Sequence, residues 1–487
     1  MKLLKIVSVI GLSTAVNLFS GFLKGKMVAV YFGSSGFGIW SQASSLFLIC
    51  GAISLFGLNQ GLVREIITKE KHKATDEFVF DTLSKSLFFS IGNSLIILLA
   101  VIFYAGKLSA LFFNNNLAPG IIIFTAVFLP LQVAGDIFGV FLLANKDIKR
   151  FALGNILISA IGLFTFSILI TLFKLKGIYY SIGIYGMITF LSFYFVSKPL
   201  IPGASHRLFI FRRQLFDSSF LKNTINFGAL RLIQTNINLI TTVLIRSLII
   251  KKIGLAENGF FEALSRLSMF YTPFISNMLW SYTFPLYCEN RDNQQLSYEV
   301  NRFTRIFFIL FVPVSTMIML FGNAFVTLLF SRDFVSIIPL FSLWFIFDLL
   351  RVASWPIGLV LIVKDRMKLA AFLELCLSII LLSTSCLVIG RYSLKGVMFS
   401  YVFSYAVFLV INYLVMNRNY AIKLNATTIS IFCISFILIF ISGKPGKALL
   451  DYIIIFSLGC VFSIIIFNKR ERLLMQDVIK KAIAWNY

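Results

Sequence analysis

One apolar stretch of the chain carries polar and cationic side chains at helical spacing. It runs from Asn223 to Ile250 and is long enough to cross a bilayer as a helix. At about 100° per residue, six of its residues fall within one sector of that helix: Arg231, Gln234, Thr235, Asn238, Thr242 and Arg246. Cations inside a membrane span are costly and normally face a bundle interior or a watery cavity. The stripe therefore indicates anion binding within a membrane, as in a transporter.

A second polar stripe lies on the first apolar stretch. Its members recur every three or four residues on one helical face: Ser13, Asn17, Ser20 and Lys24. We expect Lys24, Arg231 and Arg246 to face a cavity, whereas Lys26, on the opposite face from Lys24, can extend to the outer interface. For the neutral residues, hydrogen bonding between packed helices is an equal alternative.

Four other intramembrane charges allow local pairing. Glu262 and Arg266 are four residues apart, and Asp348 and Arg351 are three apart, so each pair can form on its own helix. We interpret both as structural ion pairs, although either could open during transport.

A carboxylate outside these pairs, Asp136, lies one helical turn from Gln132. We consider it a possible proton or cation site that couples transport to an ion gradient. Glu374 is expected near the inner interface. The balance of interior charge is positive, which favours phosphate or carboxylate and disfavours cationic drugs.

Composition places these stripes in an all-α, polytopic membrane protein. Of the 487 residues, 59% are apolar and 13% are charged. Windows of about 20 apolar residues predict about 14 membrane helices. They lie near residues 5–32, 38–61, 86–105, 117–143, 152–173, 177–197, 223–250, 259–284, 303–326, 336–362, 369–389, 395–416, 425–442 and 450–467.

The net charge of +24 follows the membrane topology. With the N-terminus inside, the inner loops and tails hold most of the Lys and Arg residues, as expected of cytoplasmic segments. An even number of spans places both termini in the cytoplasm. The charge therefore marks a membrane face and does not indicate nucleic-acid binding.

A repeat underlies the hydropathy. Residues 31–38 and 252–259 share two glycines, Lys-Asp recurs at 146–147 and 364–365, and Leu-Lys-Gly recurs at 175–177 and 394–396. A constant offset of about 220 residues predicts two parallel six-helix lobes related by a pseudo-two-fold axis along the membrane normal. The predicted segments are an N-terminal lobe 1–200, a cytoplasmic linker 201–222, a C-terminal lobe 223–418, an additional helix pair 425–467 and a basic cytoplasmic tail 468–487.

Catalytic and cofactor motifs are absent from the sequence. The segment 443–447 lacks the Walker A pattern for binding nucleotide phosphates, and no cluster of His, Cys and carboxylate residues suggests a catalytic centre or a metal site. The six scattered cysteines suggest small buried residues. We therefore expect a carrier without a cofactor, and disfavour a membrane glycan polymerase or acyltransferase.

These patterns resemble the polysaccharide transporters of the multidrug/oligosaccharidyl-lipid/polysaccharide (MOP) superfamily, notably the Wzx-type O-antigen flippases. The resemblance covers most of residues 1–420 and rests on the Lys-bearing first helix followed by residues 30–40, on residues 322–330 and on the two lobes. The additional helix pair departs from the many twelve-helix members and resembles that of the lipid II flippases, where such a pair contributes to a groove for the lipid tail.

The resemblance implies an inner-membrane flippase of bacterial surface polysaccharide biosynthesis, with both termini cytoplasmic. Its substrate would be an undecaprenyl-diphosphate-linked oligosaccharide, such as an O-antigen unit of lipopolysaccharide, moved to the periplasmic leaflet by alternating access. We expect the diphosphate at Lys24, Arg231 and Arg246, the prenyl chain in membrane lipid, and the sugars beside a polar set: Asn17, Gln42, Gln234 and Asn238. Polysaccharide polymerase and chain-length proteins are candidate partners. The alternatives are a lipid II flippase and a multidrug exporter of the same superfamily.

Overall fold

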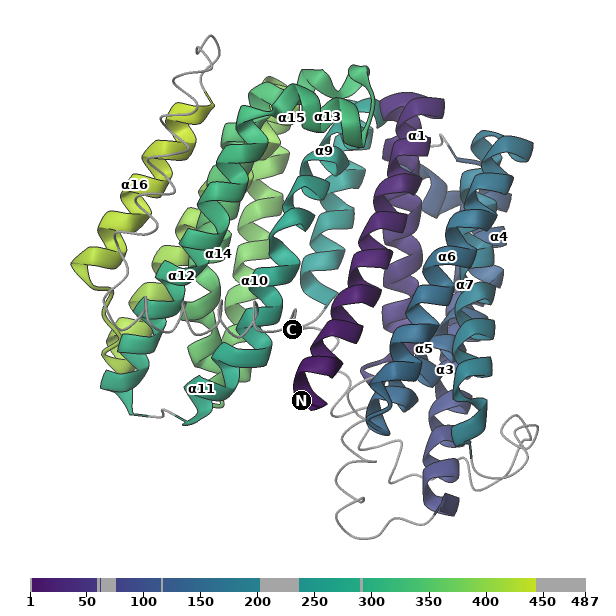
Figure 1. Ribbon diagram of the computed structural model, residues 1–487. Coiled ribbons are helices and arrows are strands. Elements are labelled where there is room, and N and C mark those ends of the chain that lie inside the picture. Colours follow the sequence, from purple (N-terminus) through teal and green to yellow (C-terminus); the bar gives the residue numbers. More distant parts are fainter. Residues whose placement is uncertain are drawn as a thin grey trace, which may run out of the picture. The chain divides into compact units, whose positions relative to one another are not determined.

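The computed structural model describes residues 2–58, 62, 76–114, 117–201, 236–289 and 292–443. Helices dominate these ranges, and no strand occurs within them (Figure 1). Eight helices of the described residues are long and apolar enough to cross a membrane. The expectation of an all-α, polytopic membrane fold is therefore confirmed.

The first half of the chain forms long helices. They are α1 (Lys2–Leu55), α3 (Asp76–Phe113), α4 (Pro119–Val127), α5 (Leu129–Ala144), α6 (Ile148–Phe173) and α7 (Leu175–Ser197), followed by the short 3-10 helix η1 (Lys198–Leu200). A further helical segment covers residues 236–252. The predicted spans of this half coincide with these helices, apart from residues 59–61 and 223–235, which lie outside the described residues.

The second half contains shorter pieces between its long helices. The elements are α9 (Leu255–Leu267), η4 (Ser268–Phe270), α10 (Thr272–Met278), η5 (Leu279–Thr283), α11 (Phe284–Glu289), α12 (Asn293–Leu320), α13 (Gly322–Leu329), η6 (Arg332–Leu340), α14 (Phe341–Val363), α15 (Met367–Tyr420) and α16 (Ala426–Ser442). The predicted span 450–467 and the tail 468–487 lie outside the described residues, so the count of 14 helices stays a prediction.

Backbone kinks divide α1 and α15 where the sequence predicts two spans in each. Gly33 interrupts α1 with φ 62° and ψ −162°. Ser393 interrupts α15 with φ 49° and ψ −140°. A positive φ is rare for a residue with a side chain, so Ser393 marks a specific turn.

The internal repeat is visible in the backbone. Left-handed φ angles occur at Lys146 (57°) and Asp365 (57°), and also at Lys174 (50°) and Ser393 (49°). Both pairs are separated by the same number of residues. By backbone conformation, Lys146 therefore corresponds to Asp365. The sequence repeat instead matches Lys146 with Lys364, the residue before Asp365. The two alignments differ by one position because the turn conformation is repeated and the side chain is not.

The repeated glycines make a reciprocal contact. A Cβ atom at Gly38 would overlap the carbonyl oxygen of Leu255, and a Cβ atom at Gly259 would overlap that of Ser34. Gly38 corresponds to Gly259 in the repeat, and Ser34 corresponds to Leu255. Such exchange of equivalent partners is what a two-fold axis produces, so this contact supports the predicted pseudo-symmetry.

Alanine at Gly38 or Gly259 is expected to lower stability in detergent by about 1–3 kcal/mol or more, since the added methyl group meets backbone atoms and not a flexible side chain. Gly92→Ala is the control, because a Cβ atom there has nothing within 4 Å. Denaturant or thermal unfolding of the purified variants measures the effect. Equal stability of all three variants would refute the close contact.

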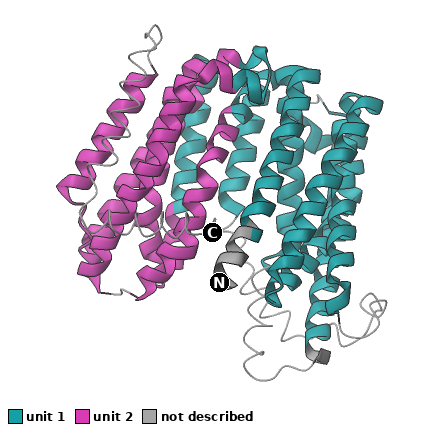
Figure 2. Cartoon of the chain, in the orientation of Figure 1, with its two compact units in different colours: residues 1–263, 326–334, 374–394 teal, residues 264–325, 335–373, 395–487 magenta. Residues whose placement is uncertain are grey.

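The chain divides into two compact units (Figure 2). Unit 1 comprises Met1–Ala263, Val326–Phe334 and Glu374–Leu394, and unit 2 comprises Leu264–Phe325, Val335–Leu373 and Lys395–Tyr487. In unit 1, α6 packs against α1 and α7, and α5 packs against α7. In unit 2, α12 packs against α14 and α16. The predicted lobe and linker boundaries stay a prediction.

Candidate functional site

A cavity of about 580 Å³ lies within unit 1. Residues of α1, α5, α6 and α7 contribute to its wall. Its polar lining residues are Lys24, Ser44, Gln132, Asp136, Ser181, Tyr185 and Asn236. Aromatic side chains, including Trp40, Phe47 and Phe166, form the rest of the wall together with aliphatic residues and glycines. The cavity therefore combines an ammonium group, a carboxylate, neutral hydrogen-bonding groups and flat apolar surfaces.

Lys24 extends between two aromatic rings of this cavity. Its Nζ atom lies 5.5 Å from the ring centroid of Tyr185 and 6.0 Å from that of Phe166. Aromatic faces stabilise a cation without using its N–H donors. No carboxylate among the described residues forms an ion pair with Lys24, so the ammonium group can bind an anion.

Asp136 faces the same cavity from α5. It accepts hydrogen bonds from Gln132 Nε2 at 3.1 Å and 3.2 Å. The Oε1 atom of Gln132 is buried and has no hydrogen-bond partner among the described residues. The neutral side chain of Gln132, one helical turn away, is therefore a hydrogen-bond partner of Asp136, as the spacing predicts. Among the described residues, no cation forms an ion pair with Asp136.

Glycines fix the position of α5 against α7. A Cβ atom at Gly135 would lie 2.7 Å from the backbone nitrogen of Phe190, and one at Gly186 would lie 2.8 Å from the carbonyl oxygen of Phe128. These approaches leave no room for side chains. The backbones are thus in direct contact here, close to Gln132 and Asp136, which line the cavity.

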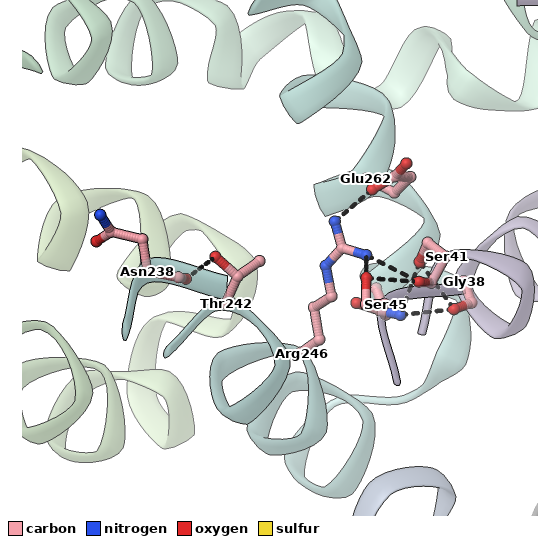
Figure 3. Close-up of polar contacts among 8 residues, drawn as sticks. Gly38, Ser41, Ser45, Asn238, Thr242, Arg246 and Glu262 are labelled. Carbon is pink, nitrogen blue, oxygen red and sulfur yellow. Dashed lines mark hydrogen bonds and ion pairs between the residues drawn. The ribbon is translucent and has the colours of Figure 1, made fainter. Parts of the chain in front are cut away.

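Arg246 is buried in a network outside the cavity lining (Figure 3). It forms an ion pair with Glu262 on α9. Its Nη1 atom donates to the carbonyl oxygen of Ser41 at 3.1 Å and to Ser45 Oγ at 2.9 Å. The charge of Arg246 is therefore balanced in this conformation.

The partner of Arg246 comes from a different helix. The spacing of Glu262 and Arg266 predicts a pair within one helix, but helical spacing contains no information about a cation on residues 236–252. A buried carboxylate can accept from more than one donor. The structure shows Glu262 in contact with Arg246. A contact between Glu262 and Arg266 stays a prediction.

The predicted neutral lining residues lie in several environments. Gln42 is fully buried, and its Nε2 atom donates to Ser247 Oγ at 2.8 Å and to the carbonyl oxygen of Phe112 at 3.2 Å. Asn238 Nδ2 donates to Glu374 Oε2 at 2.7 Å, and Asn17 is exposed. None of Asn17, Gln42 and Asn238, all within the described residues, lines this cavity. Arg231, Gln234 and Thr235 lie outside the described residues.

In unit 2, the structure brings Asp348 and Arg351 together. Arg351 Nη2 lies 2.6 Å from Asp348 Oδ1. Ser268 Oγ donates to Asp348 Oδ2 at 2.5 Å, and the Tyr271 hydroxyl donates to the same oxygen. The i,i+3 spacing indicates the ionic partner, whereas Ser268 and Tyr271 carry no sequence signal for this role because they come from other elements.

Comparison with known proteins gives consistent similarities. Residues 32–339 match a family described as polysaccharide biosynthesis proteins. The chain is 21% identical over 405 residues to the lipid III flippase of Escherichia coli (strain K12), covering 81% of this chain and 94% of the flippase. It is 23% identical over 257 residues to the teichuronic acid biosynthesis protein TuaB of Bacillus subtilis (strain 168), covering 51% of this chain and 52% of TuaB.

Solved structures share the fold. The lipid II flippase MurJ in an inward closed conformation matches with a TM-score of 0.71 and 13% sequence identity, covering 98% of this chain and 100% of that chain. An inward-facing multidrug resistance MATE family transporter of the MOP superfamily matches with a TM-score of 0.66 and 17% identity, covering 84% and 94%. At these identities the likeness shows the fold alone.

Proposed function

Because the chain belongs to the family of polysaccharide biosynthesis proteins, we propose that it moves an undecaprenyl-diphosphate-linked oligosaccharide from the cytoplasmic to the periplasmic leaflet. Membership confirms the predicted resemblance to the polysaccharide transporters. The similarity to a lipid III flippase along 94% of that protein supports a flippase in particular. The chain would transport its substrate without changing it chemically.

The ammonium group of Lys24 in the cavity of unit 1 is the observation that carries this proposal. It is partly buried, held between aromatic rings and not bound to a carboxylate of the described residues. A diphosphate brings the negative charge that this position lacks. Aromatic rings and neutral polar groups beside it suit sugar rings, which present apolar faces and hydroxyl edges.

The other predicted cations have different roles in the proposal. Arg231 is a second ligand for the diphosphate. Arg246 reaches the substrate only after releasing Glu262, so we assign it to a later conformation than Lys24. Rocking of one lobe against the other would then open the site to the periplasm, while the prenyl chain stays in lipid.

Asp136 is our candidate for coupling transport to a proton or sodium gradient. Asp136→Asn removes the charge and keeps the shape, so we expect gradient-driven flipping in proteoliposomes to fall by about tenfold. Substrate binding should change by less than about threefold, since the contact at Lys24 remains. Asp81→Asn, which alters the i,i+4 pair with Lys85 on α3, is the control. An unchanged response to imposed gradients in Asp136→Asn would remove this residue from the coupling mechanism.

A lipid II flippase is the second candidate, since a protein of that activity has the same fold as this chain. Both substrates carry a prenyl diphosphate, so the cavity serves either. The two differ in the attached sugars and peptide. Competition between purified lipid II and a lipid-linked polysaccharide unit for binding to the purified chain distinguishes the two.

The sidedness of the lipid-linked oligosaccharide in bacterial cells tests the proposal. Cells depleted of the protein are treated with a reagent that labels sugars only in the periplasmic leaflet of the inner membrane. We expect the oligosaccharide to accumulate unlabelled and to regain label when the wild-type gene is restored. Unchanged labelling after depletion would exclude this substrate. Binding to polysaccharide polymerase and chain-length proteins can be tested in the same cells by cross-linking.

A further inference from the structure

Arg351 in unit 2 is anchored by a carboxylate that is itself fixed. The side chain of Asp348 is 0% exposed. Its Oδ2 atom receives hydrogen bonds from Ser268 and Tyr271, and its Oδ1 atom contacts Arg351. Ser268 Oγ in turn accepts from Trp344 Nε1 at 2.9 Å. Asp348 is therefore held in one orientation by residues from η4, Tyr271 and α14.

The guanidinium group of Arg351 has more donors than this anchor uses. An arginine offers five N–H donors. In the described structure Nη2 lies against Asp348, and Nε has no hydrogen-bond partner. The Arg351 side chain is 21% exposed, in contrast to 0% for Asp348. The pair is thus asymmetric: the carboxylate is enclosed, and the cation is open on one side.

Aromatic rings set the direction of the open side. The Arg351 guanidinium carbon lies 5.0 Å from the ring centroid of Phe347 and 5.7 Å from that of Trp355. Two tyrosines pack against Phe347: the ring centroid of Tyr401 lies 4.9 Å from that of Phe347, and the ring centroid of Tyr405 lies 4.8 Å from it. Stacking on aromatic faces orients the planar guanidinium group and leaves its edge available for hydrogen bonds.

The repeat gives an independent reason to treat this position as a lining position. Gln132 and Arg351 are separated by the same number of residues as the left-handed turn residues Lys146 and Asp365, which follow α5 and α14. Gln132 lines the cavity of unit 1. Arg351 therefore occupies, in the second half, the place of a cavity-lining residue in the first.

We propose that Arg351 is an anion-binding residue of unit 2, which holds an oxyanion of the substrate through the free edge of its guanidinium group. The ligand is a phosphate or carboxylate, because a planar guanidinium group binds two such oxygens side by side. Asp348, Ser268 and Tyr271 are positioning residues. The proposal rests on the proposed function, and it adds an anion-binding residue in unit 2.

Two sources of the oxyanion fit this chemistry. One is the diphosphate that joins prenyl chain and sugar, and the other is an acidic group on a sugar. Binding is therefore measured with two lipid-linked oligosaccharides that share the prenyl diphosphate, one with neutral sugars and one containing a uronic acid. Inorganic diphosphate serves as a soluble competitor.

The variants separate the cation from the stability of the cluster. Arg351→Gln alone leaves the buried charge of Asp348 without its ion-pair partner and can fail to fold. The comparison is therefore between Asp348→Asn, which keeps Arg351, and Asp348→Asn with Arg351→Gln, which removes both charges and retains polar groups. Adding Arg351→Lys to Asp348→Asn restores a charge without the bidentate geometry. All are made in the full chain, and thermal unfolding checks each.

The variant that combines Asp348→Asn with Arg351→Gln is expected to bind lipid-linked oligosaccharide at least about tenfold more weakly than Asp348→Asn alone. The variant that combines Asp348→Asn with Arg351→Lys should regain part of this binding. An equal loss for both oligosaccharides, with weaker competition by inorganic diphosphate, identifies the diphosphate as the ligand. A loss confined to the uronic acid substrate identifies the sugar. Binding within twofold of Asp348→Asn for both substrates would overturn the proposal.

This outcome differs from a failure of the proposed function. If the chain does not carry lipid-linked oligosaccharides, the wild type binds neither substrate above the level of detergent micelles. If only the role of Arg351 is wrong, the wild type binds both, Lys24→Ala weakens that binding, and the Arg351 variants leave it unchanged. A folded wild type that binds is thus the internal reference for the Arg351 comparison.

Discussion

Replacement of Lys24 with alanine is expected to reduce oligosaccharide flipping by about 100-fold while leaving the fold intact. A hydrogen bond to a charged, desolvated group contributes about 1.5–3 kcal/mol, and about 2.7 kcal/mol corresponds to that factor in rate. Lys24 has only aromatic neighbours at its ammonium group among its described cation contacts. Its removal therefore leaves no buried carboxylate unpaired and should cost little stability. Flipping is measured in depleted cells with periplasmic labelling, and protein levels are measured by immunoblot.

Lys26→Ala provides a matched control for Lys24→Ala. Lys26 lies two residues along the same helix, and its Nζ atom donates to the carbonyl oxygen of Thr327 at 2.5 Å. It does not line the described cavity. We expect flipping by Lys26→Ala to stay within about threefold of wild type, since only a hydrogen bond of about 1 kcal/mol is lost. Equal defects in both variants would contradict a specific role for Lys24.

Replacement of Glu262 with alanine is expected to destabilise the protein by about 3–5 kcal/mol, because it leaves the buried cation Arg246 without its ionic partner. Both side chains of this ion pair are 8% exposed. The other hydrogen bonds of Arg246, to Ser41 and Ser45, go to neutral groups, and its guanidinium carbon lies 5.8 Å from the ring centroid of Phe261. Urea or thermal unfolding of the purified protein in detergent measures the loss.

A double variant separates the ion pair from the packing around it. Arg246→Met together with Glu262→Leu removes both charges and fills similar space, so its stability should return to within about 1–2 kcal/mol of wild type. If the stability loss of the double variant instead equals the sum of the losses caused by each change alone, Arg246 and Glu262 do not interact energetically. In the folded double variant, a flipping rate about tenfold below wild type would be expected from the proposed later contact of Arg246 with the diphosphate.

The sequence predicted the helices because each membrane span must satisfy its backbone internally and present apolar side chains outward. It also predicted the repeat, since glycines at residues 33, 38, 254 and 259 are required by backbone conformation and close contact. Hydropathy did not reveal the subdivision of residues 255–289 into several short elements. Those breaks do not interrupt the apolar character of the segment.

The candidate site was less predictable because side-chain partners come from helices distant in sequence. Helical spacing indicated Lys24 and the pair of Gln132 and Asp136, whose positions on one face follow from periodicity. It could not indicate that Tyr185 and Phe166 flank Lys24, nor that Glu262 pairs with Arg246. Gln42 illustrates the ambiguity of a polar residue in a membrane span, since it bonds to Ser247 and Phe112 between helices.

Transport by the purified chain in proteoliposomes tests the central claim most directly. A prenyl-diphosphate-linked oligosaccharide labelled on its sugar is incorporated with the protein, and its exposure to a membrane-impermeant glycosidase is followed with time. We predict exposure at least about tenfold faster than in protein-free liposomes, with loss of that acceleration in Lys24→Ala and its retention in Lys26→Ala. Exposure at the protein-free rate by folded wild-type protein, under both proton and sodium gradients, would contradict the assignment as a flippase of this substrate.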